Sequence, residues 1–457
     1  MDKILICGYG ISGRAAARLA AAHGHAVVIV DEHDSPEMQN AAGQLRREGA
    51  EVQFISGWEP GSPLPVCNSV IVSPGIRKGT SLFEAARQAL SPGGQWLSEL
   101  EFALRNIRCP FVSITGTNGK TTTTELTTAL LRANGINAES SGNIGAALSE
   151  CVLEAGRRET GCMVIETSSF QLENIARFPA CPAAILNLAS DHIDRHGSFE
   201  EYARTKFKVF AAPLPPEQRI MNLSLRPWLE KFLPGTEVTT FSAERADADF
   251  TLENGWIAFR GRRIFELASG QLRGVHNAEN MMAALALLRA LQNDDALFTE
   301  ETARALAGFH SGPHRMEVFA QQDGVTYVND SKATNPHAVN AAVRQFADGK
   351  NLLLILGGLD KGMDFTELEV SFPHIRQAFL IGQCRDALAA ELSDKIPCRM
   401  CSGFPEAVQS ACAAAKRGDV VMLSPATASM DMFKNYAERG DKFKQLVLEF
   451  LDASKKA

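Results

Sequence analysis

Short runs of β-branched and aliphatic residues alternate with helical patterns along this chain, and the alternation occurs three times. This alternation is typical of parallel sheets whose strands are joined by crossover helices. The first unit opens with "KILICGYGISGRAAARLAAAHGHAVVIVDE", which reads as a strand, a glycine turn, an alanine-rich helix, a second strand and an acid. The pattern predicts an α/β protein, and 457 residues are enough for about three domains.

Breaks in the pattern give the expected boundaries. The first unit ends near Arg105 to Pro110, where a proline precedes the strand "FVSIT". The second unit contains a helix from Thr121 to Arg132, stopped at Gly135, and closes near "HNAENMMAALALLRALQ". The third begins around "FHSGPHRMEVF" and offers the strands "VTYVND", "NLLLILGG", "AFLIG" and "VVMLSP". We expect a Rossmann-like domain at 1–107, a P-loop ATPase-like domain with a mostly parallel sheet at 108–309, and a Rossmann-like domain at 310–457.

Charge and composition exclude several classes of partner. The chain has 46 basic and 53 acidic residues, a net charge of −7, so no basic face for nucleic acid or an anionic membrane is expected. No run of 18 apolar residues occurs, and the start lacks a signal-peptide cleavage site, which predicts a cytoplasmic protein. Ten cysteines are scattered singly, and the C-x-x-C of Cys398 and Cys401 has no second pair or histidine partner to favour a metal or redox role. We expect a monomer that acts on small soluble substrates.

The stretch "FVSITGTNGKTTTT" combines a strand, a glycine turn, Lys120 and, at the start of a helix, Thr121. Backbone N–H groups and a helix N-terminus attract phosphate, the lysine adds a charge, and the hydroxyl can hold Mg2+. The stretch departs from the Walker pattern G-x-x-x-x-G-K-[ST], because Ile114 stands where the first glycine belongs. A solvated turn is the alternative, unless nearby residues supply further metal ligands.

Polar residues follow two further strands. "MVIETSSF" places Glu166 at the end of an apolar strand, where a carboxylate is costly to bury unless it faces a metal or a partner. "ILNLASDHIDRHGS" ends another strand with Asp191 and His192. Ligands of open α/β sheets bind beyond the carboxyl ends of the strands. We therefore expect Thr121, Glu166 and His192 to meet as Mg2+ ligands, although a lone histidine is ordinarily structural.

The N-terminal "GYGISG", followed by Asp31 about 20 residues on, completes a dinucleotide fingerprint. Read alone, this fingerprint favours an NAD dehydrogenase. A dehydrogenase needs no lysine loop, Mg2+ cluster or third sheet, and a nonenzymatic nucleotide-binding scaffold would not need so many ionisable groups at strand ends. A glycine turn before a helix serves any diphosphate.

Several longer motifs resemble those of one family. "GTNGKTTT", "ETSSFQLE", "DHIDRHGSFEEYARTK", "HNAEN", "PHRME", "NDSKATNP", "GGLDKGMDF" and "SPATASMDMFKNYAERGDKF" are similar to the motifs of the Mur ligases, amide-forming enzymes of peptidoglycan assembly. The resemblance extends from Gly8 to about Phe443, and "SSFQLE" and "NDSKATN" resemble the D-glutamate-adding branch. This superfamily uses the shortened G-T-x-G-K-[ST] loop for ATP. Folylpolyglutamate synthase is the nearest alternative, disfavoured because it lacks "SPGI" and a UDP-type N-terminal domain.

The resemblance implies an ATP-dependent ligase. ATP would phosphorylate the carboxylate of UDP-N-acetylmuramoyl-L-alanine, and the amine of D-glutamate would attack the acyl phosphate. Two Mg2+ ions are implied, one held by Thr121 and Glu166 and the other with help from His192 and a carbamylated Lys206; Lys208 is close enough to be confused with Lys206. The implied catalytic residues are Lys120, His192 and Lys206.

The resemblance also implies three sets of binding residues. The ATP-binding set is Gly116, Thr117, Asn118, Gly119, Lys120, Thr121, Thr122, Asn277, Asn280, Arg315 and Asp330. The UDP-substrate set is Gly10, Ile11, Ser12, Asp31, Ser73, Pro74, Gly75, Asn143 and His192, where Asp31 would face uracil or a neighbouring polar group. The D-glutamate set is Lys332, Thr334, Lys361, Ser429 and Tyr436; the family commonly has phenylalanine at the last of these positions.

Overall fold

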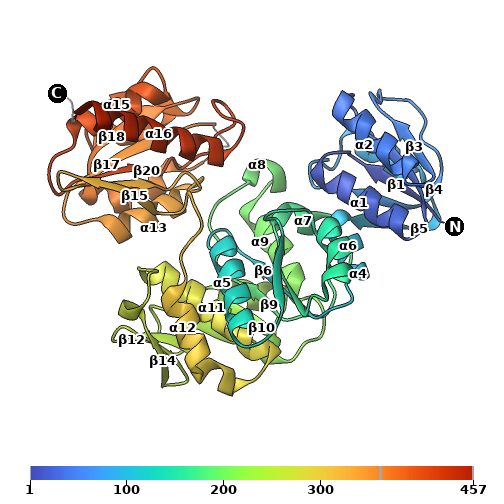
Figure 1. Cartoon of the computed structure of the whole chain (residues 1–457), viewed down its shortest axis with the longest axis horizontal. Helices are drawn as coiled ribbons and strands as arrows, with labels where there is room; N and C mark the ends of the chain where they lie inside the picture. Colours follow the sequence, from blue (N-terminus) through green and yellow to red (C-terminus); the bar gives the residue numbers. More distant parts are fainter. Residues whose placement is uncertain (1, 360–362, 455–457) are drawn as a thin grey trace. The chain divides into compact units, whose positions relative to one another are not determined.

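The computed structural model describes residues 2–359 and 363–454 and has the predicted α/β fold, with three sheets (Figure 1). The first sheet has five parallel strands in the order β3-β2-β1-β4-β5. Its strands are β1 (Lys3–Cys7), β2 (Ala26–Val30), β3 (Val52–Ile55), β4 (Cys67–Val72) and β5 (Leu90–Ser98). The strand order reverses between β1 and β4, which is the place where doubly wound sheets bind ligands.

Both faces of the first sheet are covered, because alternate residues of a strand point to opposite faces. Ile4 and Ile6 of β1 pack with α1 (Ile11–Ala22), α2 (Pro36–Arg47) and α4 (Glu99–Asn106). Leu5 and Cys7 of the same strand pack on the other face with α3 (Ser81–Gln88). This double burial explains why the strand is a continuous apolar run.

The central sheet has nine strands in the order β14-β13-β12-β11-β10-β9-β6-β8-β7. Its parallel strands are β6 (Phe111–Thr115), β7 (Ala138–Gly142), β8 (Cys162–Glu166), β9 (Ala183–Ile185), β10 (Arg219–Asn222), β11 (Thr239–Ser242) and β12 (Phe250–Glu253). The antiparallel strands β13 (Trp256–Phe259) and β14 (Arg262–Glu266) extend β12. Strand β6 lies between β9 and β8, so the lysine loop follows an interior strand of the sheet.

The third sheet has six strands in the order β15-β16-β20-β17-β18-β19, and only β15 is antiparallel. The strands are β15 (Glu317–Gln322), β16 (Val325–Asn329), β17 (Leu352–Gly357), β18 (Ile375–Ile381), β19 (Cys398–Met400) and β20 (Val420–Leu423). Figure 1 shows α13 (Pro336–Phe346) on one side of this sheet and α15 (Phe404–Ala414) and α16 (Tyr436–Ser454) on the other. Leu354 and Leu356 pack toward α13, and Leu353 and Ile355 pack toward α15 and α16.

The remaining helices connect these strands. The α-helices are α5 (Lys120–Ala133), α6 (Leu148–Arg158), α7 (Ser169–Glu173), α8 (Ile193–His196), α9 (Phe199–Phe207), α10 (Arg226–Phe232), α11 (Val275–Leu291), α12 (Glu300–Gly308) and α14 (Arg385–Leu392). The 3-10 helices are η1 (Lys208–Phe210), η2 (Pro216–Gln218), η3 (Leu223–Leu225), η4 (Leu267–Ser269), η5 (Asp294–Phe298) and η6 (Phe365–His374).

Contacts divide the chain into two compact units. Unit 1 comprises Met1–Leu188, Glu200–Ser269 and Glu279–Gly308, and unit 2 comprises Ala189–Phe199, Gly270–Ala278 and Phe309–Ala457. Unit 1 contains both the first and the central sheet. Hydrogen bonds and an ion pair connect the helices of the two sheets. Glu99 at the start of α4 accepts hydrogen bonds from N and Oγ of Ser149 in α6 at 2.9 and 2.6 Å, and Arg18 of α1 pairs with Glu150 at 2.5 Å. The three-domain division with its predicted boundaries stays a proposal.

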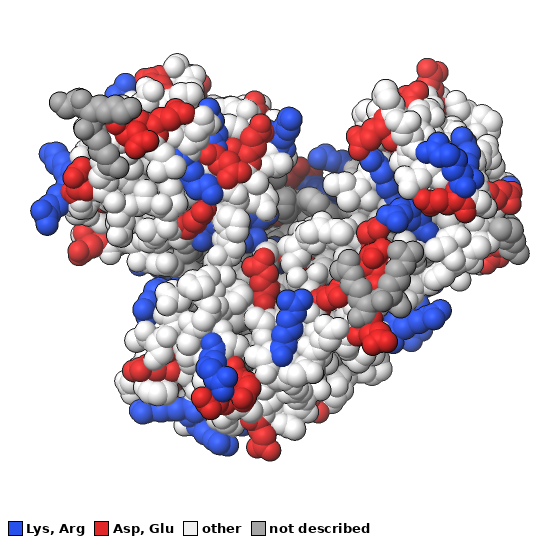
Figure 2. All heavy atoms as spheres, in the orientation of Figure 1, with Lys and Arg blue, Asp and Glu red and all other residues white. Residues whose placement is uncertain are grey.

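Surface charges are mixed. On the face in view in Figure 2, acidic and basic side chains are interspersed on each unit, without a continuous basic surface. In the part of the chain that the structure describes, no helix is both long and apolar enough to cross a membrane.

Candidate functional site

The lysine loop follows β6 and ends at the first turn of α5. Its two glycines have positive φ angles, +155° at Gly116 and +80° at Gly119, which is the left-handed N-cap of α5. A Cβ atom on Gly119 would lie 2.2 Å from Oδ1 of Asn280, so a larger residue there would displace this side chain and would have to adopt a left-handed backbone. The ammonium of Lys120 lies across the loop and donates to the oxygens of Gly116 and Thr117 at 2.9 and 2.7 Å. A lysine charge and a helix N-terminus therefore converge, as phosphate binding requires.

Oxygen ligands lie beside this loop. The hydroxyl of Thr121 donates to Glu166 at 2.5 Å, and Glu166 is buried at the end of β8. Nδ2 and the backbone N of Asn143 also donate to Glu166, to a carboxylate oxygen and the main-chain oxygen, each at 2.8 Å. A carboxylate and a threonine hydroxyl are hard oxygen donors, the type that Mg2+ prefers. Among the described residues no group of three or more His, Cys, Asp and Glu could hold a metal, so a Mg2+ ion here would also need phosphate or water oxygens.

Lys206 reaches the same loop from α9. Its side chain is 1% exposed, and Nζ donates to the oxygen of Gly116 at 2.8 Å and lies 4.7 Å from the centroid of the Tyr202 ring. The Tyr202 hydroxyl hydrogen-bonds to Oγ1 of Thr117 at 2.9 Å. Lys206 therefore lies beside the loop, as the resemblance implied.

Lys208 has a different environment. Its Nζ donates to the main-chain oxygens of Leu172 and Glu173 at 3.0 and 2.8 Å, at the C-terminal end of α7. Burial lowers the pKa of this ammonium. Its contacts are those of a lysine that caps a helix C-terminus.

Two residues that the sequence analysis did not single out hold the loop. Tyr202 contacts Thr117, and Asn187 makes two hydrogen bonds with the backbone of Asn118. The position of Asn187 two residues after the buried strand β9 is the available signal, because polar residues at the carboxyl ends of such strands are candidates for binding.

Neighbouring residues pack closely against the N-terminal glycine turn. A Cβ atom on Gly13 would lie 1.8 Å from the oxygen of Gly8, which requires glycine at the third position of the fingerprint. Ser73 donates to the same oxygen at 2.8 Å. Asp31 accepts the N–H groups of Tyr9 and His33 at 2.6 and 2.9 Å. Asp31 therefore has a structural role in shaping the turn, whatever else it contacts.

Five further residues of the expected UDP-substrate set lie around this turn, whereas Asn143 lies beside Glu166 and His192 belongs to unit 2. Gly10 is the N-cap of α1, and Ile11, at its first position, is 76% exposed. Ser12 follows in the first turn of α1, and Pro74 and Gly75 form a turn after Ser73. The structure therefore groups these five residues at the strand-order reversal of the first sheet.

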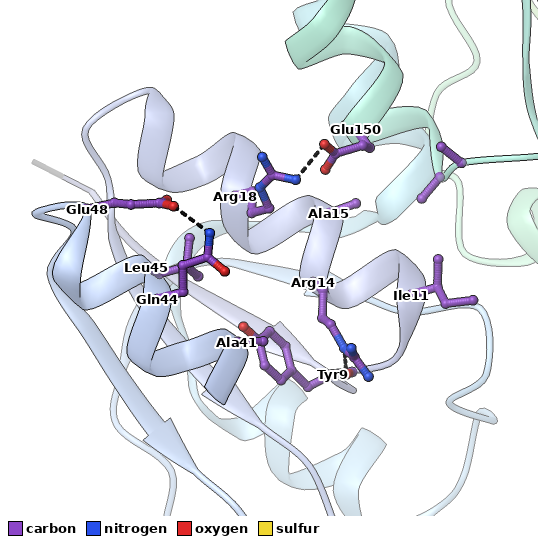
Figure 3. A pocket seen from close by; sticks show the side chains of 12 residues that line it. Tyr9, Ile11, Arg14, Ala15, Arg18, Ala41, Gln44, Leu45, Glu48 and Glu150 are labelled. Carbon is purple, nitrogen blue, oxygen red and sulfur yellow. Dashed lines mark hydrogen bonds and ion pairs between the residues drawn. The ribbon is translucent and has the colours of Figure 1, made fainter. Parts of the chain in front are cut away.

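A cavity of about 350 Å³ lies beside this turn, between α1, α2 and the N-terminal end of α6 (Figure 3). Its lining includes Tyr9, Ile11, Leu45 and Ala147. Figure 3 shows Arg18 and Glu150 paired at its edge. Of the residues expected to bind the UDP-substrate, Ile11 lines it, whereas Asp31 is not part of its described lining.

Asp191 and His192 belong to unit 2. His192 has a left-handed backbone, with φ of +56°, and its Nε2 lies 3.5 Å from Oδ2 of Asp191. Asn335 Nδ2 lies 3.5 Å from the same oxygen. Thr121 and Glu166 meet within unit 1, while their expected meeting with His192 stays a prediction.

The remaining nucleotide residues lie on both units. Asn280 in unit 1 accepts a hydrogen bond from Thr123 at 3.2 Å and packs on Gly119, and Thr122 is buried in the first turn of α5. Asn277 in unit 2 donates to the oxygen of Arg273 at 2.8 Å, which is the contact of a helix-end amide.

Arg315 lies between two residues with positive φ, His314 at +66° and Met316 at +47°. Asp330 fixes this segment, because it accepts the N–H of Met316 at 3.1 Å and the hydroxyl of Ser424 at 2.8 Å. Burial raises the pKa of Asp330 to about 7, and these two hydrogen bonds oppose the shift. Strained backbone on both sides of an arginine is characteristic of functional segments.

The expected D-glutamate residues come together in part. Nζ of Lys332 lies 3.8 Å above the ring centroid of Tyr436, at the start of α16. Ser429 is buried, and Thr334 is half-buried before α13. Lys361 lies outside the described residues.

Two family models match the chain. The "Mur ligase middle domain" matches residues 114–288, and the "Mur ligase, glutamate ligase domain" matches residues 314–427. Together they cover more than half of the chain, including the lysine loop, Glu166 and Lys332.

Curated proteins are similar over their full length. The UDP-N-acetylmuramoylalanine–D-glutamate ligase of Geobacter metallireducens is 36% identical over 97% of both chains. The enzyme of the same name from Frankia casuarinae is 38% identical over 96% of this chain and 92% of its own. Among solved structures, the MurF ligase of Thermotoga maritima in complex with ADP has a TM-score of 0.59 at 18% identity, over 94% of this chain and 96% of its own.

Proposed function

This chain belongs to the Mur ligase family, and from that premise we propose that it adds D-glutamate to UDP-N-acetylmuramoyl-L-alanine, driven by ATP, in peptidoglycan synthesis. The observation that carries this function is full-length similarity to ligases that bear this name. The lysine loop beside Thr121 and Glu166 supports the ATP-dependent chemistry independently, because it joins phosphate-binding and metal-binding groups at one sheet edge.

ATP binds with its phosphate chain on the loop from Gly116 to Thr122. The backbone N–H groups and the N-terminus of α5 bind the phosphate oxygens, and Lys120 neutralises charge on the transferred phosphoryl group. By the family resemblance, Asn277, Asn280 and Asp330 contact the nucleotide, and Arg315 reaches a phosphate. Phosphoryl transfer depends mainly on positioning and electrostatics, which these residue types supply.

Thr121 and Glu166 would hold one Mg2+ ion, and by the family resemblance His192 and a carbamylated Lys206 would help hold a second. When bound, the ions neutralise charge on the phosphate chain. The donor chemistry fits the first ion, since Thr121 and Glu166 supply only oxygens. An ammonium at Lys206 would not fit a cation, whereas a carbamate would. It forms when the neutral amine attacks CO2, an N–C bond forms and a proton leaves to water.

The sugar-linked substrate binds through its diphosphate at the N-terminal glycine turn. Gly10, Ile11 and Ser12 form the start of α1, where N–H groups are available to phosphate oxygens. Ser73, Pro74 and Gly75 continue the site, and Asn143 links it to Glu166. The alanyl carboxylate accepts the γ-phosphoryl group of ATP and becomes an acyl phosphate.

D-glutamate brings two carboxylates, which require cations and hydroxyl donors. Lys332, Thr334, Lys361 and Ser429 supply these groups, and Tyr436 supports Lys332 through the face of its ring. The amine of D-glutamate attacks the acyl phosphate, so the amide bond forms as phosphate leaves.

The rival reading, an NAD dehydrogenase, is not supported. Its fingerprint "GYGISG" is present, but a hydride-transfer enzyme does not need the lysine loop or the carboxylate beside it. The amino acid that the enzyme requires distinguishes the proposed ligase from a folylpolyglutamate synthase.

The test is release of phosphate from ATP in the presence of UDP-N-acetylmuramoyl-L-alanine and one amino acid at a time: D-glutamate, L-glutamate, L-lysine or D-alanine. We expect release that requires D-glutamate. Equal release with all four amino acids would contradict the proposed substrate.

A further inference from the structure

Asn187 lies just beyond the end of β9, which pairs with β6, the strand that leads into the lysine loop. Its side-chain amide makes two hydrogen bonds with a single residue of that loop. The N–H of Asn118 donates to Oδ1 of Asn187 at 2.8 Å, and Nδ2 of Asn187 donates to the oxygen of Asn118 at 3.1 Å. The N–H of Thr117 donates to the main-chain oxygen of Asn187 at 3.0 Å.

A primary amide offers the same donor and acceptor as a peptide group. Asn187 thus pairs with Asn118 as a neighbouring strand would, and fixes the rotation of the peptide groups on either side of Asn118. Their orientation matters, because N–H groups bind phosphate only when they point toward it.

The short loop explains why such support is needed. Two residues, Thr117 and Asn118, separate Gly116 from Gly119, where the full Walker pattern has four. A shorter loop has fewer internal hydrogen bonds with which to hold itself. Other side chains fix its ends: Tyr202 contacts Thr117, and Asn280 packs on Gly119.

We propose that Asn187 is a positioning residue that holds the lysine loop in its phosphate-binding form without touching the nucleotide. This inference rests on the proposed ATP site. In this proposal, Asn187 supplies hydrogen bonds that residues within the loop supply in a full-length Walker loop.

The substitution Asn187→Asp tests this role with almost no change in shape. The carboxylate still accepts the N–H of Asn118, but it cannot donate, and an anionic oxygen then faces the oxygen of Asn118. We expect the Kd of ADP, measured by calorimetry near pH 8, to rise about tenfold or more, because a donor is replaced by a repulsive contact. Affinity for the UDP-substrate stays that of the wild type.

Protonation of the new carboxylate should restore ADP binding to the Asn187→Asp variant. A residue with only a structural role would not show this recovery. The oxygen of Asn118 favours a protonated carboxyl group at position 187, and the charge of Lys120, which donates to Thr117, opposes that shift; a protonated carboxyl group again offers one donor and one acceptor. As the pH falls from about 8 to about 5, the ratio of variant to wild-type Kd returns toward one. The ratio cancels the effect of pH on ADP itself.

Asn134→Asp is the matched control. Nδ2 of Asn134 donates to Leu130 and Thr302, each at 2.9 Å, at the opposite end of α5. This control loses the same donor and lowers the melting temperature, but leaves the Kd of ADP unchanged. The inference is overturned if Asn187→Asp binds ADP as the wild type does near pH 8, if its loss persists unchanged at low pH, or if the control loses equal affinity. Failure of the wild type to bind ADP would instead contradict the proposed ATP site.

Discussion

Lys120 and Lys206 donate to the same acceptor, the main-chain oxygen of Gly116, at 2.9 and 2.8 Å. Their nitrogens therefore lie within roughly 6 Å of each other, a separation at which like charges repel appreciably. Lys206 is almost fully buried, so water screens this repulsion poorly. A carbamate on Lys206 would replace the repulsion by attraction and supply an oxygen ligand for Mg2+.

Lys206→Ala is expected to be nearly inactive, because the variant cannot form the proposed carbamate. Short carboxylic acids added to the assay should restore part of the activity by supplying oxygens at the same place. The measurement is the rate of phosphate release with and without acetate. A variant that keeps most of its activity would mean that no carbamate ligand operates here.

Lys208→Ala is the control for this experiment. Lys208 caps the end of α7 and does not contact the loop, so its loss should lower thermal stability while turnover at a permissive temperature changes little. The reverse result, with Lys208 essential and Lys206 dispensable, would shift the carbamate assignment by two residues.

Lys120→Ala removes the charge that neutralises the transferred phosphoryl group. Loss of one such preorganised contact typically costs on the order of 100-fold or more in rate. The measurement is kcat at saturating ATP. Lys208→Ala, which removes another lysine of the same unit, is the control. Near-normal turnover would show that the loop is structural.

The N-terminal glycine turn is expected to bind UDP-substrate and not NAD. A ligand that binds only the folded state stabilises it by about 2.7 kcal/mol at 100 times its Kd. UDP-N-acetylmuramoyl-L-alanine should therefore raise the melting temperature and slow hydrogen exchange in residues 3–98, which span the first sheet. Protection by NAD with none by the UDP-substrate would favour a dehydrogenase.

Asp330 is expected to make the stability of the protein depend on pH. Its folded pKa is raised from 3.8 to about 7 by burial, so between these values the unfolded chain loses a proton that the folded chain keeps. Stability is therefore lost as the pH rises from about 4 to about 7, by at most about 4 kcal/mol, and no further above that range. Asp330→Asn should lose less stability than the wild type across this window, as measured by urea unfolding.

Asp323→Asn is the control for that measurement, because Asp323 is an exposed acid of the same unit. Its pH profile should overlay that of the wild type. Parallel profiles for the wild type and Asp330→Asn would argue against a raised pKa at Asp330.

The three sheets were predictable because apolar runs and helical patterns alternate so regularly. The hairpin strands β13 and β14 were not predicted, although each follows a two-residue turn that ends in glycine, Asn254-Gly255 and Arg260-Gly261. All four of these residues have positive φ, as primed hairpin turns require. These turns are visible in the sequence, but the parallel pattern of the surrounding strands favours crossover connections over a hairpin.

The candidate site was partly predictable for a different reason. Thr121 follows β6 and Glu166 ends β8, and these strands are paired in one parallel sheet, so strand order alone brings the two residues to the same edge. The contacts of Asn187 and Tyr202 with the loop were not predictable, although the place of Asn187 after a strand marked it as a candidate, because the contacts join residues 69 and 85 positions apart in the chain. Asp31 is a different case. The sequence predicted that it contacts a ligand, but in the structure its carboxylate accepts hydrogen bonds from the backbone N–H groups of Tyr9 and His33.

Transfer of oxygen-18 from substrate to phosphate tests the acyl-phosphate account most directly. UDP-N-acetylmuramoyl-L-alanine labelled in its alanyl carboxylate is incubated with ATP, Mg2+ and D-glutamate, and the released phosphate is analysed by mass spectrometry. The account predicts one labelled oxygen in each phosphate released, because the carboxylate oxygen that attacks ATP leaves with the phosphate when the amide forms. Unlabelled phosphate, released at the rate of amide formation, would contradict it.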